Sequence, residues 1–158
     1  MDMELEELYE GAGRLKAKGA VPDTYGGTGD PDDPDGAVLT EFIEYINVWH
    51  AQNRPDWLEA LYQVLAWQFE TFHEGADGYY ENFYGDSPRE VQVKTADFLE
   101  KNGYLELAAP YRQGMDSTVQ GISEWMDEHL ETVWWFCLDI LEKHKSDWPE
   151  PEERNKNG

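Results

Sequence analysis

The sequence predicts an all-α protein, a single-domain bundle of about six helices with a Gly/aromatic turn in the middle. Apolar residues recur at spacings of three and four along most of the chain, which is the period of a helix buried on one face. No segment alternates apolar and polar residues for long enough to predict a strand. The 158 residues suit one domain, and 40% of them are hydrophobic, which can supply a core.

The predicted helices together form one acidic domain over residues 1–145. The first helix is indicated by Leu5, Leu8 and Leu15, which share one helical face. The expected helical ranges are 3–18, 39–54, 55–73, 88–101, 105–113 and 117–143.

A loop rich in Gly, Asp and Pro is expected at residues 19–37. Its DPDDPDG run invites comparison with a calcium-binding loop, which needs acidic or amide ligands at fixed positions before a glycine. Counting back from Gly36 places Pro31 at the first ligand position, and the closing position holds Phe42 instead of Glu. We therefore interpret this segment as a linker.

The second and third helices are separated by a break. Phe42 and Ile46 lie on the apolar face of the second helix, which we expect to end near Arg54. Pro55 suits the first turn of a new helix, because its missing N–H has no partner there in any case. Apolar residues then continue to about His73.

An unusual segment, HEGADGYYENFYGD, follows at residues 73–86. Its glycines and aspartates predict a loop, yet it contains four aromatic residues, which loops at the surface rarely leave exposed. Either these rings fold back into the core or they face a partner or a pocket.

The fourth and fifth helices have clear boundary signals. In SPRE, Ser87 can cap the helix, Pro88 suits its first position and Glu90 completes a capping box. Gly103 marks the end of this helix. The next helix contains Pro110, where we expect it to bend or restart.

The last helix is predicted to be long and continuous. Its core stripe includes Ile122, Met126 and Val133, and it is expected to end at Lys143. Residues 146–158 are rich in charge and proline and predict a flexible C-terminal tail, in which a tryptophan can still dock.

The charge balance limits the choice of partner. The chain has 34 acidic and 12 basic residues, a net charge of −22. This balance excludes binding to nucleic acid through neutralised phosphates and argues against an anionic membrane surface. A basic protein is the natural complement. Solubility and adaptation to high salt are the alternative explanations of the acidity.

The predicted location is the cytoplasm. Cys137 is the only cysteine and lies in the apolar run VWWFCLDIL, so we expect a reduced core residue. The acidic N-terminus lacks the pattern of a signal peptide, and no apolar stretch reaches the length of a membrane span.

The sequence offers no catalytic set, so we predict no enzyme, no cofactor and no metal site. Glu70 and His73 form one Glu-x-x-His pair, whereas a di-iron bundle uses two such pairs with further glutamates. Neither a phosphate-binding glycine loop nor a nucleophile elbow occurs.

The most distinctive feature is a row of carboxylates on the predicted last helix. Residues 113–142 contain no Lys or Arg. The row lies at spacings of three and four, opposite the core stripe, and includes like-charge pairs that a helix selected for stability would avoid. An aromatic side chain on the same side could anchor a partner. The expected partner-binding residues are Glu124, Asp127, Glu128, Glu131 and Trp135.

A resemblance to a known family is carried by the run FETFHEGADGYYENFYGDSPREVQVKTADFLEKNGYLELAAPYRQGM. It resembles the small, acidic, helical bacterial proteins described as DNA-mimic proteins, many of which are otherwise known only as a domain of unknown function. Gly78, Tyr79, Tyr80 and Asn82 stand where that family has a glycine, aromatics and an asparagine. The match covers roughly residues 58–115.

The resemblance implies that the aromatic turn belongs to the core. Gly78 would then supply a positive φ, and Asn82 would bond to the loop backbone. Tyr79 and Phe83 would close the end of the bundle.

The resemblance also implies a function. We expect an acidic protein that occupies the DNA-binding surface of a basic protein such as a transcription regulator. The alternatives are an immunity-type inhibitor of a basic toxin or nuclease, and a helical protein with solubility charge and a small-molecule pocket. A homodimer is compatible with each of them.

Overall fold

The computed structural model describes residues 2–19, 35–73, 75–82, 88–116 and 120–152. These segments contain helices and no strand, so the predicted all-α class is confirmed. The eight helices of this part of the chain are α1 (Met3–Lys18), α2 (Val38–Trp49), α3 (Asp56–His73), α4 (Ala76–Asn82), α5 (Pro88–Lys101), α6 (Leu105–Met115), α7 (Ile122–Glu128) and α8 (Leu130–Lys143).

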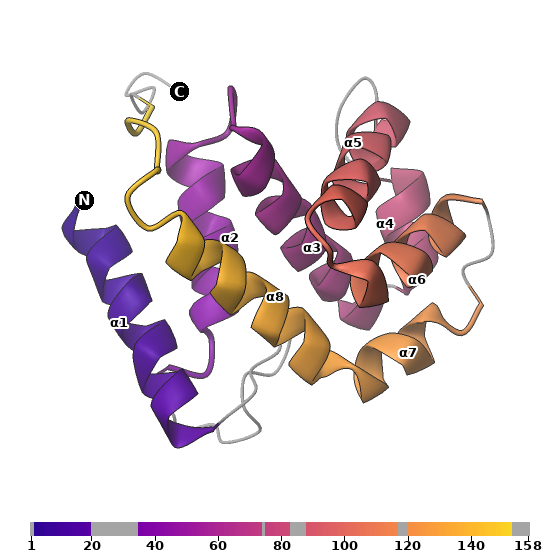
Figure 1. Ribbon diagram of the computed structural model, residues 1–158, viewed down its shortest axis with the longest axis horizontal. Helices are drawn as coiled ribbons and strands as arrows, with labels where there is room; N and C mark the ends of the chain where they lie inside the picture. The colour runs from indigo at the N-terminus through magenta and orange to yellow at the C-terminus, as the bar shows by residue number, and fades with distance from the viewer. Residues whose placement is uncertain (1, 20–34, 74, 83–87, 117–119, 153–158) are drawn as a thin grey trace.

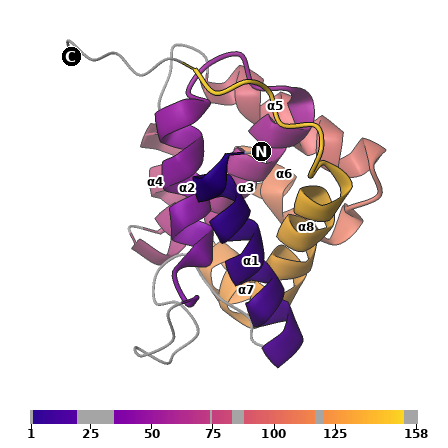
Figure 2. The ribbon, with the colours of Figure 1, turned by 90° about the vertical axis from the view of Figure 1, so that its left-hand side faces the viewer.

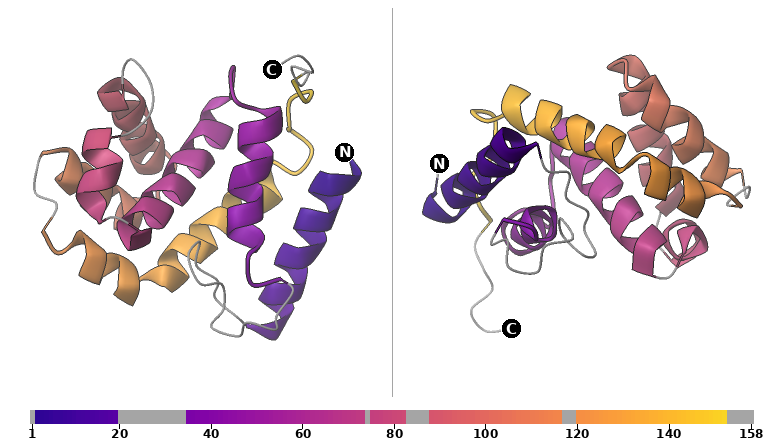
Figure 3. Two further views of the ribbon diagram at one scale, coloured as in Figure 1. Left: turned by 180° about the vertical axis from the view of Figure 1, so that it is seen from behind. Right: turned by 90° about the horizontal axis from the view of Figure 1, so that it is seen from below.

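Two helices, α3 and α8, run through the middle of the molecule (Figure 1). The α1–α2 pair lies on one side of them, and α4, α5 and α6 form a group on the other side, as the further views in Figure 3 also show. Figure 2 shows α1 in front, with α2 on one side of it and α8 on the other. Helix α3 packs against α2, α4, α5, α7 and α8, so it connects the two sides.

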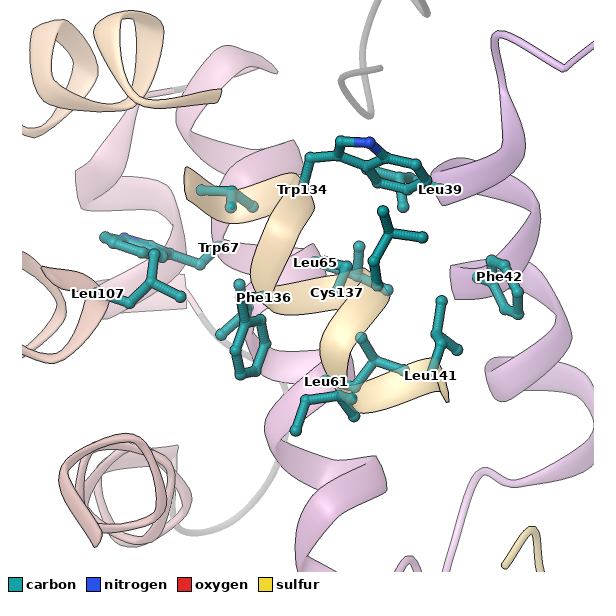
Figure 4. Packing of buried hydrophobic residues seen from close by; sticks show 14 of the residues in the cluster. Leu39, Phe42, Leu61, Leu65, Trp67, Leu107, Trp134, Phe136, Cys137 and Leu141 are labelled. Atoms are coloured by element: carbon teal, nitrogen blue, oxygen red, sulfur yellow. The ribbon is translucent and has the colours of Figure 1, made fainter. Parts of the chain in front are cut away.

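The core lies where α8 crosses α3 (Figure 4). Side chains from α2, α3, α6 and α8 meet there, and each is at most 2% exposed. They include Leu39, Phe42, Leu61, Leu65, Trp67, Leu107, Trp134, Phe136, Cys137 and Leu141. Burial of each large apolar side chain contributes about 1.5–3 kcal/mol. Burial also raises the pKa of the Cys137 thiol, which keeps it neutral and inert.

Helix α1 has the predicted bounds and a cap at each end. The Asp2 carboxylate accepts a hydrogen bond from the Leu5 N–H at 2.8 Å, and Gly19 ends the helix with φ 70°. Arg14 donates two 2.8 Å hydrogen bonds to the buried carboxylate of Asp35. This pair holds Asp35, which lies near the end of the predicted loop, next to α1.

Helix α2 is shorter than predicted, because it ends at Trp49 instead of near Arg54. Asn53 adopts φ 55°, a left-handed conformation that Asn tolerates better than most residues. Arg54 then donates to the His50 carbonyl at 2.6 Å, which satisfies the end of the helix.

Helix α5 begins at Pro88, as predicted, and Ser87 lies outside the described residues. It ends at Gly103, which has φ 85°. The Tyr104 N–H donates to the Leu99 carbonyl at 2.8 Å and the Gly103 N–H to the Glu100 carbonyl at 3.2 Å, the two bonds of a Schellman motif.

The helix does not restart at Pro110, because α6 continues through it. A proline inside a helix removes the hydrogen bond to the carbonyl four residues earlier. That residue is Glu106, which is exposed, so water can replace the missing donor.

The predicted single helix over 117–143 is also wrong, because it is broken at His129 into α7 and α8. His129 has φ −123° and ψ 27°. Its ring stacks on that of Trp125, with the centroids 4.5 Å apart, and its Nδ1 hydrogen-bonds to the Trp125 carbonyl at 2.7 Å. That carbonyl would otherwise accept only a backbone hydrogen bond within the helix. The chain therefore changes direction between the two helices (Figure 1).

Residues 76–82 of the aromatic segment form a helix, α4, where a loop was predicted. Gly78 is helical and buried, so the expected positive φ there is wrong, and Gly75 has it instead, with φ 91°. Tyr79 is fully buried and donates to Gln63 at 2.7 Å, and Tyr80 donates to the Tyr111 carbonyl at 2.7 Å. Burial of these rings outweighs the weak helix propensity of the segment.

The described residues that follow α8 pack against α1, α2 and α3. The ring of Trp148 packs edge to face against the rings of Tyr45 and Trp57, with centroid distances of 5.8 and 5.2 Å. Its indole N–H donates to the Tyr9 hydroxyl at 2.8 Å. The Glu152 N–H donates to the Trp49 carbonyl at 2.8 Å. Residues 147–152 of the expected tail therefore contact α1, α2 and α3.

We predict that Gly114→Ala destabilises the protein. A Cβ at Gly114 would lie 2.2 Å from the ring of Tyr80, and that ring is held by its bond to Tyr111. Forced overpacking of this kind costs about 1–3 kcal/mol. Gly13→Ala is the matched control, because no atom lies within 4 Å of its Cβ position, and it should stabilise α1 by up to about 1 kcal/mol. Denaturant unfolding measures both, and equal stability of Gly114→Ala and wild type would contradict the predicted clash.

We also predict that His50 makes stability depend on pH. Its ring is 2% exposed, next to Tyr45 and Trp148, and burial lowers its pKa from 6.5 against the opposing charges of Glu152 and Asp2. Below pH 6.5 the unfolded chain binds a proton that the folded chain resists, so stability falls with falling pH, by at most about 1.4 kcal/mol per unit.

The measurement is the free energy of unfolding between pH 7.5 and 5, for wild type and for His50→Leu. The carboxylates titrate in both proteins, so the difference in slope isolates the imidazole. Parallel curves would mean that His50 does not contribute.

Candidate functional site

The predicted acidic face spans two helices. Glu124, Asp127 and Glu128 lie on α7, and Glu131 and Trp135 lie on α8. All five side chains are exposed, whereas the residues opposite them on each helix are buried in the core. The break at His129 corrects the expected straight stripe, because only its first three carboxylates belong to one helix.

The part of this face on α7 has a charge spacing close to that of a nucleic acid strand. From Glu124 to Glu128 the helix rises roughly 6 Å, in steps of about 4.5 and 1.5 Å, so the three carboxylates average about one per 3 Å of axis. One strand of duplex DNA carries one charge per about 3.4 Å. Of the two expected like-charge pairs, Glu124 and Glu128 remain one turn apart, and Asp127 and Glu131 are separated by the break.

The acidic face lacks compensating bases within the described part of the chain. None of its four carboxylates has a Lys or Arg partner among residues 2–19, 35–73, 75–82, 88–116 and 120–152. Most basic side chains form ion pairs elsewhere. Those pairs are Arg14–Asp35, Lys16–Glu142, Lys18–Asp35, Arg54–Glu59, Lys94–Glu90, Arg112–Asp97, Arg112–Glu100 and Lys143–Asp139.

Trp135 connects the acidic face to a groove. Its side chain is 51% exposed, and its indole N–H donates to Glu131 at 3.2 Å, which orients the ring. The ring lines a groove of about 660 Å³ between α8 and the start of α6. A large aromatic that is half exposed and held in place is the kind of residue that anchors protein interfaces.

A second acidic surface, between α1 and α2, was missed by the sequence analysis. Glu4 and Glu7 of α1 and Glu41 and Glu44 of α2 line a cleft of about 450 Å³. Burial, and then the nearby charges of Glu44 and Asp35, raise the pKa of Glu41. Each pair is visible in the sequence at a spacing of three, but the pairing of the two helices is not.

The aromatic residues suggested by the resemblance do not belong to the exposed surface. Tyr79 and Tyr80 are 0% and 7% exposed, and Gly78 is buried. The side chain of Asn82 and the whole of Phe83 lie outside the described residues. The described part of this motif therefore packs inside the molecule and leaves binding to other surfaces.

In the part of the chain that the structure describes, no group of three or more His, Cys, Asp or Glu residues is placed so that it could hold a metal ion. Glu70 is half-buried in α3, and the side chain of His73, its partner in the Glu-x-x-His pair, is outside the description.

Comparison with known proteins found no protein-family model, no curated protein and no solved structure that matches this chain. Among the described residues, none of the helices combines the length and apolar character that crossing a bilayer requires.

Proposed function

We propose that this protein binds a basic protein and occupies its nucleic-acid-binding surface, as a DNA mimic. The observation that carries the proposal is the acidic face, in which Glu124, Asp127, Glu128 and Glu131 are exposed and have no basic partner among the described residues. The resemblance seen in the sequence agrees with this function. The proposed action is binding, without catalysis.

The electrostatics of the acidic face favour fast and selective capture. Rows of like charge raise the association rate of an oppositely charged partner and repel acidic competitors. The partner supplies the lysines and arginines that the chain lacks between residues 113 and 142. Trp135 adds an apolar contact, which limits the orientations in which the partner can bind.

The break at His129 favours a second candidate on the same surface, an immunity-type inhibitor of a basic toxin or nuclease. A straight row of carboxylates would suit a long DNA-binding groove, but this row is straight for roughly 6 Å only, before α8 turns away. A compact basic patch, such as the phosphate site of a nuclease, matches that length.

We predict that charge reversal at Glu128 and Glu131 abolishes capture. The double variant Glu128→Lys/Glu131→Lys places two positive charges in the centre of the face. It should leave the thermal melt unchanged or slightly raised, because Glu124 and residue 128 become an attractive pair one turn apart. The matched control is Glu41→Lys/Glu44→Lys, which changes the net charge equally but lies on the α1–α2 cleft.

The measurement is capture of lysate proteins on the immobilised chain, followed by elution with duplex DNA or with polyglutamate. Nucleic-acid-binding proteins should be retained by wild type and by the control, lost by Glu128→Lys/Glu131→Lys, and eluted by duplex DNA. Retention should weaken as salt is raised, since exposed charges are screened beyond about 8 Å at physiological ionic strength. If both double variants lose capture of the lysate proteins equally, the effect comes from net charge alone. Partners that bind duplex DNA and this protein at the same time would overturn the proposed mimicry.

A further inference from the structure

The groove beside Trp135 combines an apolar floor with an acidic rim. Leu107, Phe136 and Leu138 are buried and form the floor, and Leu105 and Trp135 stand at its sides. Leu105 is 63% exposed and Trp135 is 51% exposed, so two of the most exposed large apolar side chains among the described residues face one depression. Water contact with this area is unfavourable, which favours a covering partner.

The rim of the groove has a net negative charge. Glu106, Asp139 and Glu142 lie on it, and Lys16 is the one base among its lining residues. Within the described residues Glu106 has no ion pair, whereas Glu142 pairs with Lys16 at 2.8 Å and Asp139 with Lys143 at 2.9 Å. Both pairs are largely exposed and contribute little, so a partner's arginine or lysine can replace either base.

The groove is long enough for a short helix. Its lining on α8 extends from Thr132 to Glu142, which is roughly 15 Å of helix axis, or about three turns. Helices bind such grooves through apolar side chains at positions i, i+3 or i+4, and i+7.

We propose that this groove is the docking site for a basic amphipathic helix of the partner. Its apolar side chains contact Leu105 and Trp135, and its lysines or arginines face Glu106 and Glu131. Because Glu131 bonds to Trp135, the groove and the acidic face form one continuous surface. This inference rests on the proposed function and specifies its partner, a protein whose basic region is an amphipathic helix.

The test uses labelled helical peptides of about 18 residues and fluorescence anisotropy. One peptide carries leucines at i, i+3, i+4 and i+7 with lysines on its other faces. A second has the same lysines with alanine for leucine, and a third has the leucines with glutamine for lysine. Wild type should bind the leucine–lysine peptide about tenfold more tightly than either other peptide, because apolar and charged contacts both contribute.

Substitutions in the groove test whether the leucine–lysine peptide binds there. Leu105→Ala and Trp135→Ala should each weaken binding of the leucine–lysine peptide about tenfold, with unchanged melts since both side chains are exposed. Val93→Ala is the matched control, because Val93 is a 38% exposed apolar residue on α5, away from the groove lining. Equal effects of all three variants, or equal affinity for the glutamine peptide, would overturn the proposal.

The failure of this inference is distinguishable from failure of the proposed function. If Glu128→Lys/Glu131→Lys abolishes capture of lysate proteins and the two groove variants leave it intact, the acidic face binds the partner and the groove does not. If the charge reversal leaves capture intact, the proposed function itself is wrong.

Discussion

The burial of α8 against α3 determines what this helix contributes to the groove and to the acidic face. Seven of the fourteen residues of α8 are buried, which leaves it a single narrow outer stripe. That stripe contains Glu131, Trp135, Asp139 and Glu142, at spacings of four, four and three. The core therefore fixes which side chains face outward, and no rotation of α8 could hide Trp135 without exposing Trp134 or Phe136. The α8 side of the groove and two residues of the acidic face, Glu131 and Trp135, follow from this one packing arrangement.

Much of the fold could be predicted from local signals, and the failures have a common cause. The bounds of α1 follow from its two caps and the C-terminal end of α5 from Gly103, signals that act within a few residues. The break at His129 carries no proline or glycine, and the apolar stripe continues across it from Met126 to Val133. Both α7 and α8 pack on α3 and α6, but they run in different directions on either side of the turn that the His129–Trp125 bond holds (Figure 1). Tertiary packing of this kind overrides the periodicity of one segment.

Some features of the candidate site could likewise be predicted from the sequence, and others could not. Exposure of Glu124 or Glu128 could be predicted, since charged residues opposite an apolar stripe face water. The groove could not, because Leu105 and Trp135 are thirty residues apart and meet only through the approach of α6 to α8. The same holds for the cleft between α1 and α2. Helix pairing decides both surfaces, and a single sequence does not specify it.

The contacts of Tyr9 bear on the order in which the chain becomes structured. Its hydroxyl donates to the Leu141 carbonyl at 2.7 Å and accepts from Trp148 at 2.8 Å, across sequence separations of 132 and 139 residues. During synthesis α1 leaves the ribosome well before the groups that hold it to α8 and Trp148. Until then α2 is its main neighbour. Contacts of such separation slow folding, so α1 is secured only after α8 and Trp148 have been made.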